Sequence, residues 1–326
     1  MDRGFLRQAF SPLRLFAVAA ATVMIFLLAN RLGWPQLLTR AGAPNPFWLA
    51  LAGLAYMAKI ALRATRLGAL LQPARPNWAR MAMATQMVTL LGNLLPFRVG
   101  ELSFVFLMRQ QFGIEAGKAT GGLFFVRLHD FLSVAMVYAG LALVFGAPQG
   151  GVPWGYVAAV MAVLLLALLL VSKYLAALAN VFLGWLPALQ KLPGAQKFTR
   201  GLNDFTASQA RLSLAIGFAE WLANFVFGYW LLRAFGFSYG FLTAATAQAF
   251  SIFASVIPIT TVGNFGSQDG GWIYGASLAG VDLAEATLSG LLVHAAMLFF
   301  ILSFGLVALL AYAVVGKPGP AQPPAP

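Results

Sequence analysis

The sequence predicts an all-α polytopic integral membrane protein with about six full spans and two oppositely oriented re-entrant helical hairpins, arranged as an inverted repeat. Three observations predict it. Of the 326 residues 60% are hydrophobic and only 9% are charged, whereas soluble domains carry about 25% charged residues. Continuous apolar runs of membrane length recur along the chain, as in spanning helices and unlike the alternating strands of a barrel. Two further apolar regions are interrupted by proline and glycine.

Six apolar runs are long enough to cross the roughly 30 Å hydrocarbon core of a bilayer. They occupy residues 13–31, 46–62, 119–146, 153–172, 212–233 and 286–315. The first run follows Arg3, Arg7 and Arg14, as a signal peptide would. It is long, and no convincing small-residue cleavage site follows, so we expect it to be retained as a span.

The interrupted regions predict two hairpins that enter the membrane and return on the same side. Their paired segments are residues 81–95 and 99–112 around Pro96, and residues 240–258 and 270–281 around Pro258 and a glycine-rich stretch. Apolar segments of about 10–14 residues more often dip into a bilayer than cross it. Proline breaks a helix because it lacks a backbone donor, and the freed backbone survives at depth only beside protein or a wet cavity.

Basic residues between the runs predict the orientation, because cytoplasmic loops are enriched in Lys and Arg. We place the N-terminus and the entry of the first hairpin in the cytoplasm, and the entry of the second hairpin on the opposite side. Fifteen basic residues then fall inside and three outside. The inside residues are Arg3, Arg7, Arg14, Arg63, Arg66, Arg75, Arg80, Arg109, Lys118, Lys173, Lys191, Lys197, Arg200, Arg211 and Lys317, and the outside residues are Arg31, Arg40 and Arg233. Both termini are therefore expected in the cytoplasm.

This layout predicts a single transmembrane domain over residues 1–316 that contains two related halves. Residues 46–146 and residues 212–315 each follow the order span, hairpin, span, in opposite orientations. Inverted repeats with broken helices near the midplane recur in secondary transporters. Between the halves, residues 173–211 predict a cytoplasmic linker with one interfacial amphipathic helix. Residues 317–326 are rich in Pro and Ala and predict a disordered tail.

Composition excludes several classes of function. The net charge is +12, but the basic residues lie between apolar runs and form no solvated face for nucleic acid. Cysteine is absent, which excludes disulfides, thiolate catalysis and Cys-ligated metals. The two histidines, His129 and His294, are far apart in sequence, so we expect neither a metal site nor a cofactor. No catalytic signature of a known type occurs, and we expect no enzyme activity.

Acidic residues inside apolar stretches are the strongest indication of a functional site. The chain has only nine Asp and Glu, and four of them lie in such stretches: Glu101, Asp130, Glu220 and Asp269. A carboxylate at bilayer depth is costly unless it meets a partner, water or a proton, so these residues predict a polar site within the membrane.

The first hairpin carries a candidate site at its break. Pro96 ends one short segment, Gly100 allows close backbone approach, and Arg98 and Glu101 are three apart on one helix face. One interpretation is an internal ion pair that holds the hairpin tip. The other is that Arg98 binds an anionic headgroup, since a guanidinium can bind two phosphate oxygens, while Glu101 orients it or takes a proton.

Arg127 and Asp130 lie three apart in the predicted span 119–146 and can pair with each other. They form either a structural pair or part of one network with the hairpin charges. His129 faces elsewhere on the helix, and it is more simply a satisfied core residue than a proton carrier. His294 is a still weaker candidate.

The second break contains Gly263, Gly266 and Asp269 among hydroxyl and amide side chains. A helix that begins after Gly266 would direct its amides into a cavity and favour an anion. Asp269 would cap that helix, which is a sufficient structural role by itself. Glu220 either pairs with an arginine across the bundle or lies near the cytoplasmic end of its span.

These motifs together resemble the lysylphosphatidylglycerol synthase transmembrane, flippase-like family over roughly residues 10–315. The matching residues are Asn93, Pro96, Arg98, Gly100, Glu101, Arg127, Asp130, Pro258, Gly263, Gly266 and Asp269. Family members usually carry Glu before the Arg of the second motif and Glu as the last acid, where this chain has Val126 and Asp269. The resemblance implies a multi-pass protein of the bacterial inner membrane that translocates lipid, without the soluble aminoacyl-transfer domain.

We therefore expect a lipid transporter with a central polar cavity. Arg98 and Arg127 would bind an anionic or glycosylated headgroup, and Asn93, Glu101, Asp130, Gly263, Gly266 and Asp269 would complete the site. Two alternatives stay open at this point. One is a non-catalytic membrane partner of a glycosyltransferase or lipid-modifying enzyme, and the other is an intramembrane enzyme that acts on a lipid-linked substrate.

Overall fold

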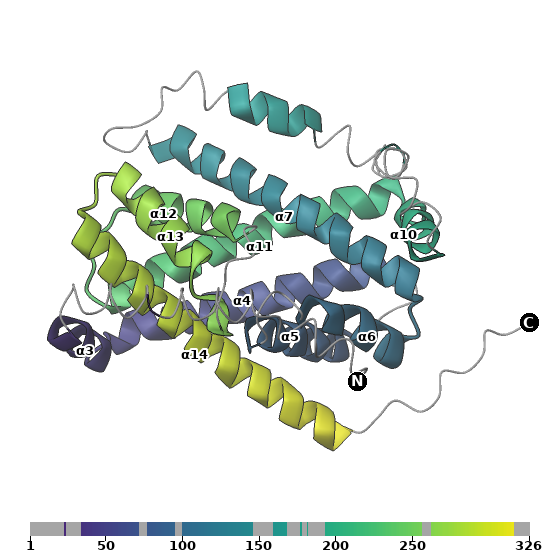
Figure 1. The fold of residues 1–326 in the computed structure, drawn as a ribbon, viewed down its shortest axis with the longest axis horizontal. Coiled ribbons are helices and arrows are strands. Elements are labelled where there is room, and N and C mark those ends of the chain that lie inside the picture. The colour runs from purple at the N-terminus through teal and green to yellow at the C-terminus, as the bar shows by residue number, and fades with distance from the viewer. Residues whose placement is uncertain are drawn as a thin grey trace, which may run out of the picture.

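In the computed structural model, all regular elements of the described residues are helices. The structure describes residues 34–71, 77–94, 100–145, 159–167, 193–255 and 262–315, with residues 23, 177 and 181. The labelled helices lie side by side in a bundle (Figure 1). The prediction of an all-α protein is confirmed for this part of the chain.

Four helices are long and apolar enough to cross a membrane. They are α4 (Pro46–Leu71), α7 (Ala116–Phe145), α11 (Ala207–Ala234) and α14 (Leu283–Val315). At about 1.5 Å per residue each exceeds the roughly 30 Å of a hydrocarbon core. Large apolar side chains such as Leu54, Val144 and Phe299 are exposed on their outer faces. The chain is therefore a multi-pass membrane protein, whose outer surface is suited to lipid rather than water.

Four shorter helices form two pairs between the long ones. They are α5 (Trp78–Leu94), α6 (Gly100–Phe112), α12 (Phe241–Ala254) and α13 (Ser267–Leu278). The turn η2 (Val262–Asn264) lies between α12 and α13. At about 1.5 Å per residue, even the longest of the four reaches only about 26 Å, which is less than the hydrocarbon thickness. Their bounds agree closely with the broken segments that the sequence predicts.

Helices α4 and α11 run antiparallel. The Asn45 amide at the start of α4 donates to the Ala234 carbonyl at the end of α11, at 2.8 Å. At the other end, Gln209 Nε2 donates to the Leu70 carbonyl at 3.4 Å. The chain therefore leaves α4 toward α5 and α6 at one end of the bundle, and leaves α11 toward α12 and α13 at the opposite end (Figure 1).

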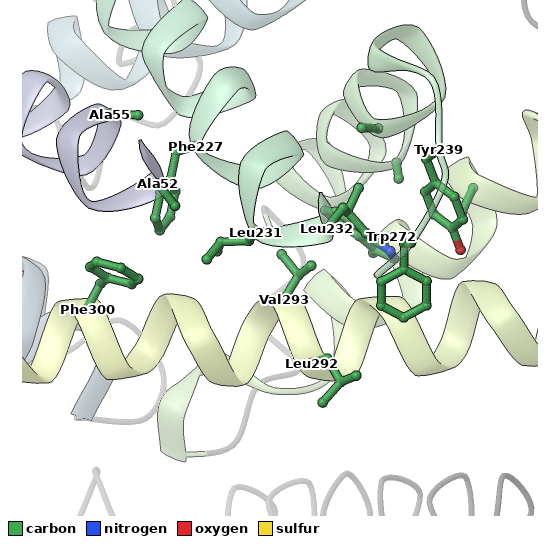
Figure 2. Close-up of a cluster of buried hydrophobic side chains, with 14 of the residues drawn as sticks. Ala52, Ala55, Phe227, Leu231, Leu232, Tyr239, Trp272, Leu292, Val293 and Phe300 are labelled. Atoms are coloured by element: carbon green, nitrogen blue, oxygen red, sulfur yellow. The ribbon is translucent and has the colours of Figure 1, made fainter. Parts of the chain in front are cut away.

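An apolar core joins the two halves. Ala52 of α4, Phe227 and Leu231 of α11, and Val293 and Phe300 of α14 belong to one buried cluster (Figure 2). The aromatic ring centroids of Phe227 and Phe300 are 5.4 Å apart, edge to face. This core fixes the long helices on which the polar site is built.

Glycines allow close helix contacts where no large side chain would fit. In α13, a Cβ at Gly271 would lie 2.5 Å from the Phe250 carbonyl of α12. Helix α10 (Pro193–Asn203) rests on the start of α7 in the same way, because Gly201 lies against the Gly117 carbonyl. Small residues are the usual means of close packing between membrane helices.

The predicted end of the second span, at residue 62, is wrong. Helix α4 continues to Leu71 and includes Arg63 and Arg66, which the sequence analysis placed in a cytoplasmic loop. Arg66 is fully buried, at 0% exposure. The helix continues because acids from other helices compensate these charges. Of the remaining predicted spans, 13–31 lies outside the described residues apart from Val23, and 153–172 is described only at 159–167, which is helical.

Candidate functional site

Arg66 of α4 is the centre of a buried ionic network. Its Nη1 lies 2.5 Å from Asp130 Oδ1 of α7 and 3.2 Å from Glu220 Oε2 of α11. Its Nε donates to Ser213 Oγ at 3.3 Å, and its Nη2 donates to the Val126 carbonyl at 3.3 Å. All three nitrogens of the guanidinium thus have acceptors, which is what a buried arginine requires.

The backbone leaves room for this guanidinium at Gly217. A Cβ at that position would lie 2.9 Å from the Arg66 Cζ. Since Ser213 and Glu220 lie on the same helix at spacings of four and three from Gly217, one face of α11 presents a hydroxyl, a gap and a carboxylate to Arg66. The network therefore links α4, α7 and α11.

Further cations surround the same acids. Arg63 Nε lies 3.6 Å from Glu220 Oε1, and Arg127 Nη1 lies 3.8 Å from Asp130 Oδ2. Lys59 donates from Nζ to Asn224 Oδ1 at 2.7 Å. With Arg66, the described side chains here include four cations and two acids. Positive charge therefore exceeds negative charge by two, which suits an anionic ligand.

A central cavity of about 230 Å³ opens beside this network. Lys59, Arg63 and Arg127 line it, together with Asp130. Further polar side chains on its wall are Thr85, Thr89, Asn93, Asn224, Ser255, Asn264 and Gln268. A water needs only about 10–15 Å³ of such space, so the cavity has room for several waters or a small polar headgroup.

The end of α5 meets the turn η2 at the wall of this cavity. Asn264 of η2 donates from Nδ2 to Asn93 Oδ1 of α5, at 3.1 Å. Asn93 is next to the last residue of α5, and Asn264 is the last residue of η2. This hydrogen bond joins two segments that are 171 positions apart in sequence and that enter the bundle from opposite ends.

A second polar cluster lies beside the turn η2. His294 of α14 contacts Asp269 Oδ1 through Nδ1 at 2.7 Å and the Gly263 carbonyl through Nε2 at 2.9 Å. The Gly266 amide donates to Asp269 Oδ2 at 2.8 Å. Gly263 and Gly266 have φ values of 81° and 131°, which favour glycine.

The structure brings together part of the predicted site. Asn93, Arg127 and Asp130 line the central cavity, while Asp269 lines a smaller adjoining one. Gly263 and Gly266 are buried beside Asp269, at the start of α13. Helix α6 begins at Gly100, as the break predicts, and Glu101 follows within it. The remaining predicted residues, Pro96, Arg98 and Pro258, lie outside the described residues.

The contacts of three further residues bear on the sequence expectations. Glu220 pairs with arginines across the bundle and not with the solvent at a helix end. Asp269 does serve the start of α13, but from the third helical position, where it accepts the Gly266 amide. His129 is buried, and its ring lies 4.1 Å from the Phe125 ring, centroid to centroid. It does not line either cavity.

Sequence reasoning missed Lys59, Arg63, Arg66 and the role of His294. The three cations were assigned to the cytoplasmic end of a span because they follow a run of apolar residues. A helical signal was available: residues 59, 63 and 66 are spaced by four and three, so they form one polar stripe. For His294 no sequence pattern points to Asp269, because their contact joins two different helices.

Comparison with known proteins identifies a family. The model of the family described as Lysylphosphatidylglycerol synthase TM region matches residues 14–305. No curated protein matches the chain. The matched range covers α4, α7 and α11, α14 as far as residue 305, and both clusters of the candidate site. The chain therefore belongs to the lysylphosphatidylglycerol synthase transmembrane-region family.

Proposed function

We propose that this protein is a flippase-like lipid transporter of the bacterial inner membrane. An anionic or glycosylated lipid headgroup passes through the central cavity, while the acyl chains stay in the bilayer. The observation that carries the proposal is the polar cavity at mid-length of the long helices, with Lys59, Arg63 and Arg127 on its wall. Charged residues at such depth are expensive and mark substrate pathways.

Two re-entrant hairpins would form the gates of this cavity. Helices α5 and α6 are too short to cross, and so are α12 and α13. They attach at opposite ends of the bundle, since α4 and α11 are antiparallel. The hydrogen bond between Asn93 at the end of α5 and Asn264 of η2 supports a contact between the two hairpins. Displacing one tip would open the cavity to one side of the membrane, which is the geometry that alternating access needs.

The order of helices supports an inverted repeat. The lengths of α4 to α7 are 26, 17, 13 and 30 residues, and those of α11 to α14 are 28, 14, 12 and 33. Each half is thus long, short, short, long. In secondary transporters such repeats place the substrate site at their interface, near the midplane.

Surface charge supports the orientation with the α4–α5 connection in the cytoplasm. The end of the bundle at which α4 finishes carries Arg80, Arg109, Lys118, Lys197, Arg200 and Arg211 among the described residues. The opposite end carries Arg40 and Arg233. Such asymmetry is typical of a cytoplasmic face. It also gives the headgroup of an anionic lipid an attractive approach from that side.

A leaflet-accessibility assay tests the proposal. Vesicles that contain the purified protein and a trace of fluorescent phosphatidylglycerol are treated with a membrane-impermeant reductant, which destroys fluorescence only in the outer leaflet. Transport brings inner-leaflet lipid into reach, so the protected fraction should fall. A fluorescent glycolipid and a fluorescent phosphatidylcholine in parallel vesicles identify the headgroup class.

Two matched variants link the result to the cavity. Arg63→Gln removes a cation from the cavity wall, whereas Arg211→Gln makes the same change at an exposed position of α11. We expect transport to be lost in the first and kept in the second. An unchanged protected fraction with all three lipids would refute the proposal, and stable co-purification of a lipid-modifying enzyme would then favour a docking role.

A further inference from the structure

His294 stands between two hydrogen-bond acceptors. Its Nδ1 lies 2.7 Å from the Asp269 carboxylate, and its Nε2 lies 2.9 Å from the Gly263 carbonyl. The imidazole is buried, at 5% exposure, and stacks on the Phe265 ring with centroids 4.2 Å apart. Because the ring is buried and stacked, it cannot turn to other partners unless residues 263–266, which we call the tip, also move.

The number of protons determines whether both contacts are hydrogen bonds. A neutral imidazole has one N–H, a carbonyl only accepts, and an ionised carboxylate only accepts. Both contacts are therefore satisfied only when the pair holds one extra proton. That proton lies either on His294, as an imidazolium beside ionised Asp269, or on Asp269, which then donates to a neutral His294. Without it, one ring nitrogen faces an acceptor lone pair.

Among the described residues that line its pocket, Asp269 and His294 are the only titratable groups. A cavity of about 50 Å³ adjoins Asp269 and His294. The other described residues on its wall are amide, hydroxyl or apolar: Asn224, Phe227, Gly228, Gln248, Ser251, Ile252, Gln268, Trp272, Gly290, Val293 and Met297. A charged side chain approaches this pocket from α4, where Lys59 donates from Nζ to Asn224 Oδ1. Asn224 and Gln268 also line the central cavity, so the two cavities share a polar wall.

The same pair holds the shape of the hairpin tip. His294 fixes the Gly263 carbonyl, and Asp269 fixes the Gly266 amide at 2.8 Å. Asn264, between these two anchors, has a φ of 62° and donates to Asn93. Asn is one of the few non-glycine residues that readily adopt a left-handed conformation, and the two anchors hold the backbone on either side of it. The proton on the pair thus supports the contact between the two hairpins.

We propose that Asp269 and His294 form a proton-binding site and that its proton keeps the 263–266 tip closed against Asn93. On release, the proton passes to water in the cavities, the Gly263 or Asp269 contact is lost, and the tip moves away. This inference rests on the proposed function in one respect: tip movement then couples proton release to headgroup passage. The proton site itself requires no transported lipid.

Magnetic resonance of the two imidazoles tests the proton directly. In protein with ¹⁵N-labelled histidine and ¹³C-labelled aspartate, His294→Gln assigns the His294 ring and Asp269→Asn assigns the Asp269 carboxyl. We expect an additional proton on the pair at neutral pH, seen either as two N–H groups on His294 or as a protonated Asp269. A neutral His294 beside an ionised Asp269 throughout the pH range of the folded protein would overturn the proposal.

Cross-linking tests the tip. The chain has no cysteine, so Asn93→Cys with Asn264→Cys gives a single reactive pair. Asp269→Asn serves as the matched background, because its amide can donate to a neutral His294 while its oxygen accepts the Gly266 amide. It keeps the hydrogen bonds and removes the carboxyl group of the pair. Cysteine reactivity itself depends on pH. Both proteins, with Asp269 and with Asp269→Asn, carry the same cysteine pair, so this dependence cancels in the ratio of their cross-linking rates.

We expect this ratio to fall as pH rises, by up to about tenfold per pH unit above the midpoint, which is the limit for one proton. A ratio independent of pH would contradict the proposal. If the double-cysteine protein does not fold, amide hydrogen exchange over residues 262–269 of the cysteine-free protein, again divided by that of Asp269→Asn, supplies the same readout.

A transport experiment separates this inference from the proposed function. In vesicles, a pH gradient should alter the transport rate of the wild type but not of Asp269→Asn. If neither protein transports lipid, the proposed function fails, while the proton site is still decided by the magnetic resonance and cross-linking results.

Discussion

Arg66 and Asp130 form a buried ion pair, 2.5 Å between Nη1 and Oδ1, although they lie 64 positions apart on different helices. Glu220 adds a third helix to the pair at 3.2 Å. One guanidinium therefore connects α4, α7 and α11 next to the cavity. Several properties of the fold depend on this connection, and each can be measured.

Replacing Arg66 should strongly destabilise the protein. Arg66→Met leaves Asp130 and Glu220 buried with less compensation, and breaking a buried pair costs about 3–5 kcal/mol. We expect a lower melting temperature in detergent, measured by intrinsic fluorescence. Arg211→Gln, an exposed change on α11, is the control and should have little effect.

The same network predicts a rescue. Arg66→Met combined with Asp130→Asn and Glu220→Gln removes the buried charges together, and well-matched neutral replacements of buried ion networks are often tolerated. The triple variant should be more stable than Arg66→Met alone. Equal stability of the two would show that charge compensation is not the reason for the loss.

Gly217 should tolerate no side chain. Gly217→Ala places a Cβ 2.9 Å from the Arg66 Cζ, and such overpacking typically costs about 1–3 kcal/mol. Gly140→Ala on α7 is the matched control, because no heavy atom lies within 4 Å of its Cβ position. Thermal unfolding of both variants decides the point, and an equal response would refute the crowding argument.

The contact between the end of α5 and η2 should appear as a coupling energy. Asn93→Ala removes the acceptor, and Asn264→Gly removes the donor while keeping the left-handed φ of 62°. A double-mutant cycle on unfolding should give about 0.5–1.5 kcal/mol for this hydrogen bond. Strict additivity would mean that α5 and η2 do not interact.

Helix α10 should detach from the bundle when its close contact is filled. Gly201→Val would drive a side chain into the Gly117 carbonyl of α7. We expect faster proteolysis between α10 and α11, at residues 204–206, as seen by mass spectrometry. Gly42→Val, at a position with no heavy atom within 4 Å, is the control, and equal cleavage rates would contradict the docking of α10 on α7.

The sequence by itself determined the membrane class, the four long helices and the two pairs of broken helices. These depend on local properties: continuous hydrophobicity sets which segments enter lipid, and proline and glycine set where helices end. It also identified Asn93, Arg127, Asp130 and Asp269, because a polar residue within an apolar run is visible without its partners.

Only the tertiary structure decided which charges are compensated and by what. Arg63 and Arg66 follow an apolar run, and local rules end the span there; the helix continues because Asp130 and Glu220 arrive from other helices. His294 gains its significance only from Asp269 and Gly263. The free energy of a buried charge or proton depends on atoms that are near in space and far along the chain, so the partners had to be located before the chemistry of the site could be inferred.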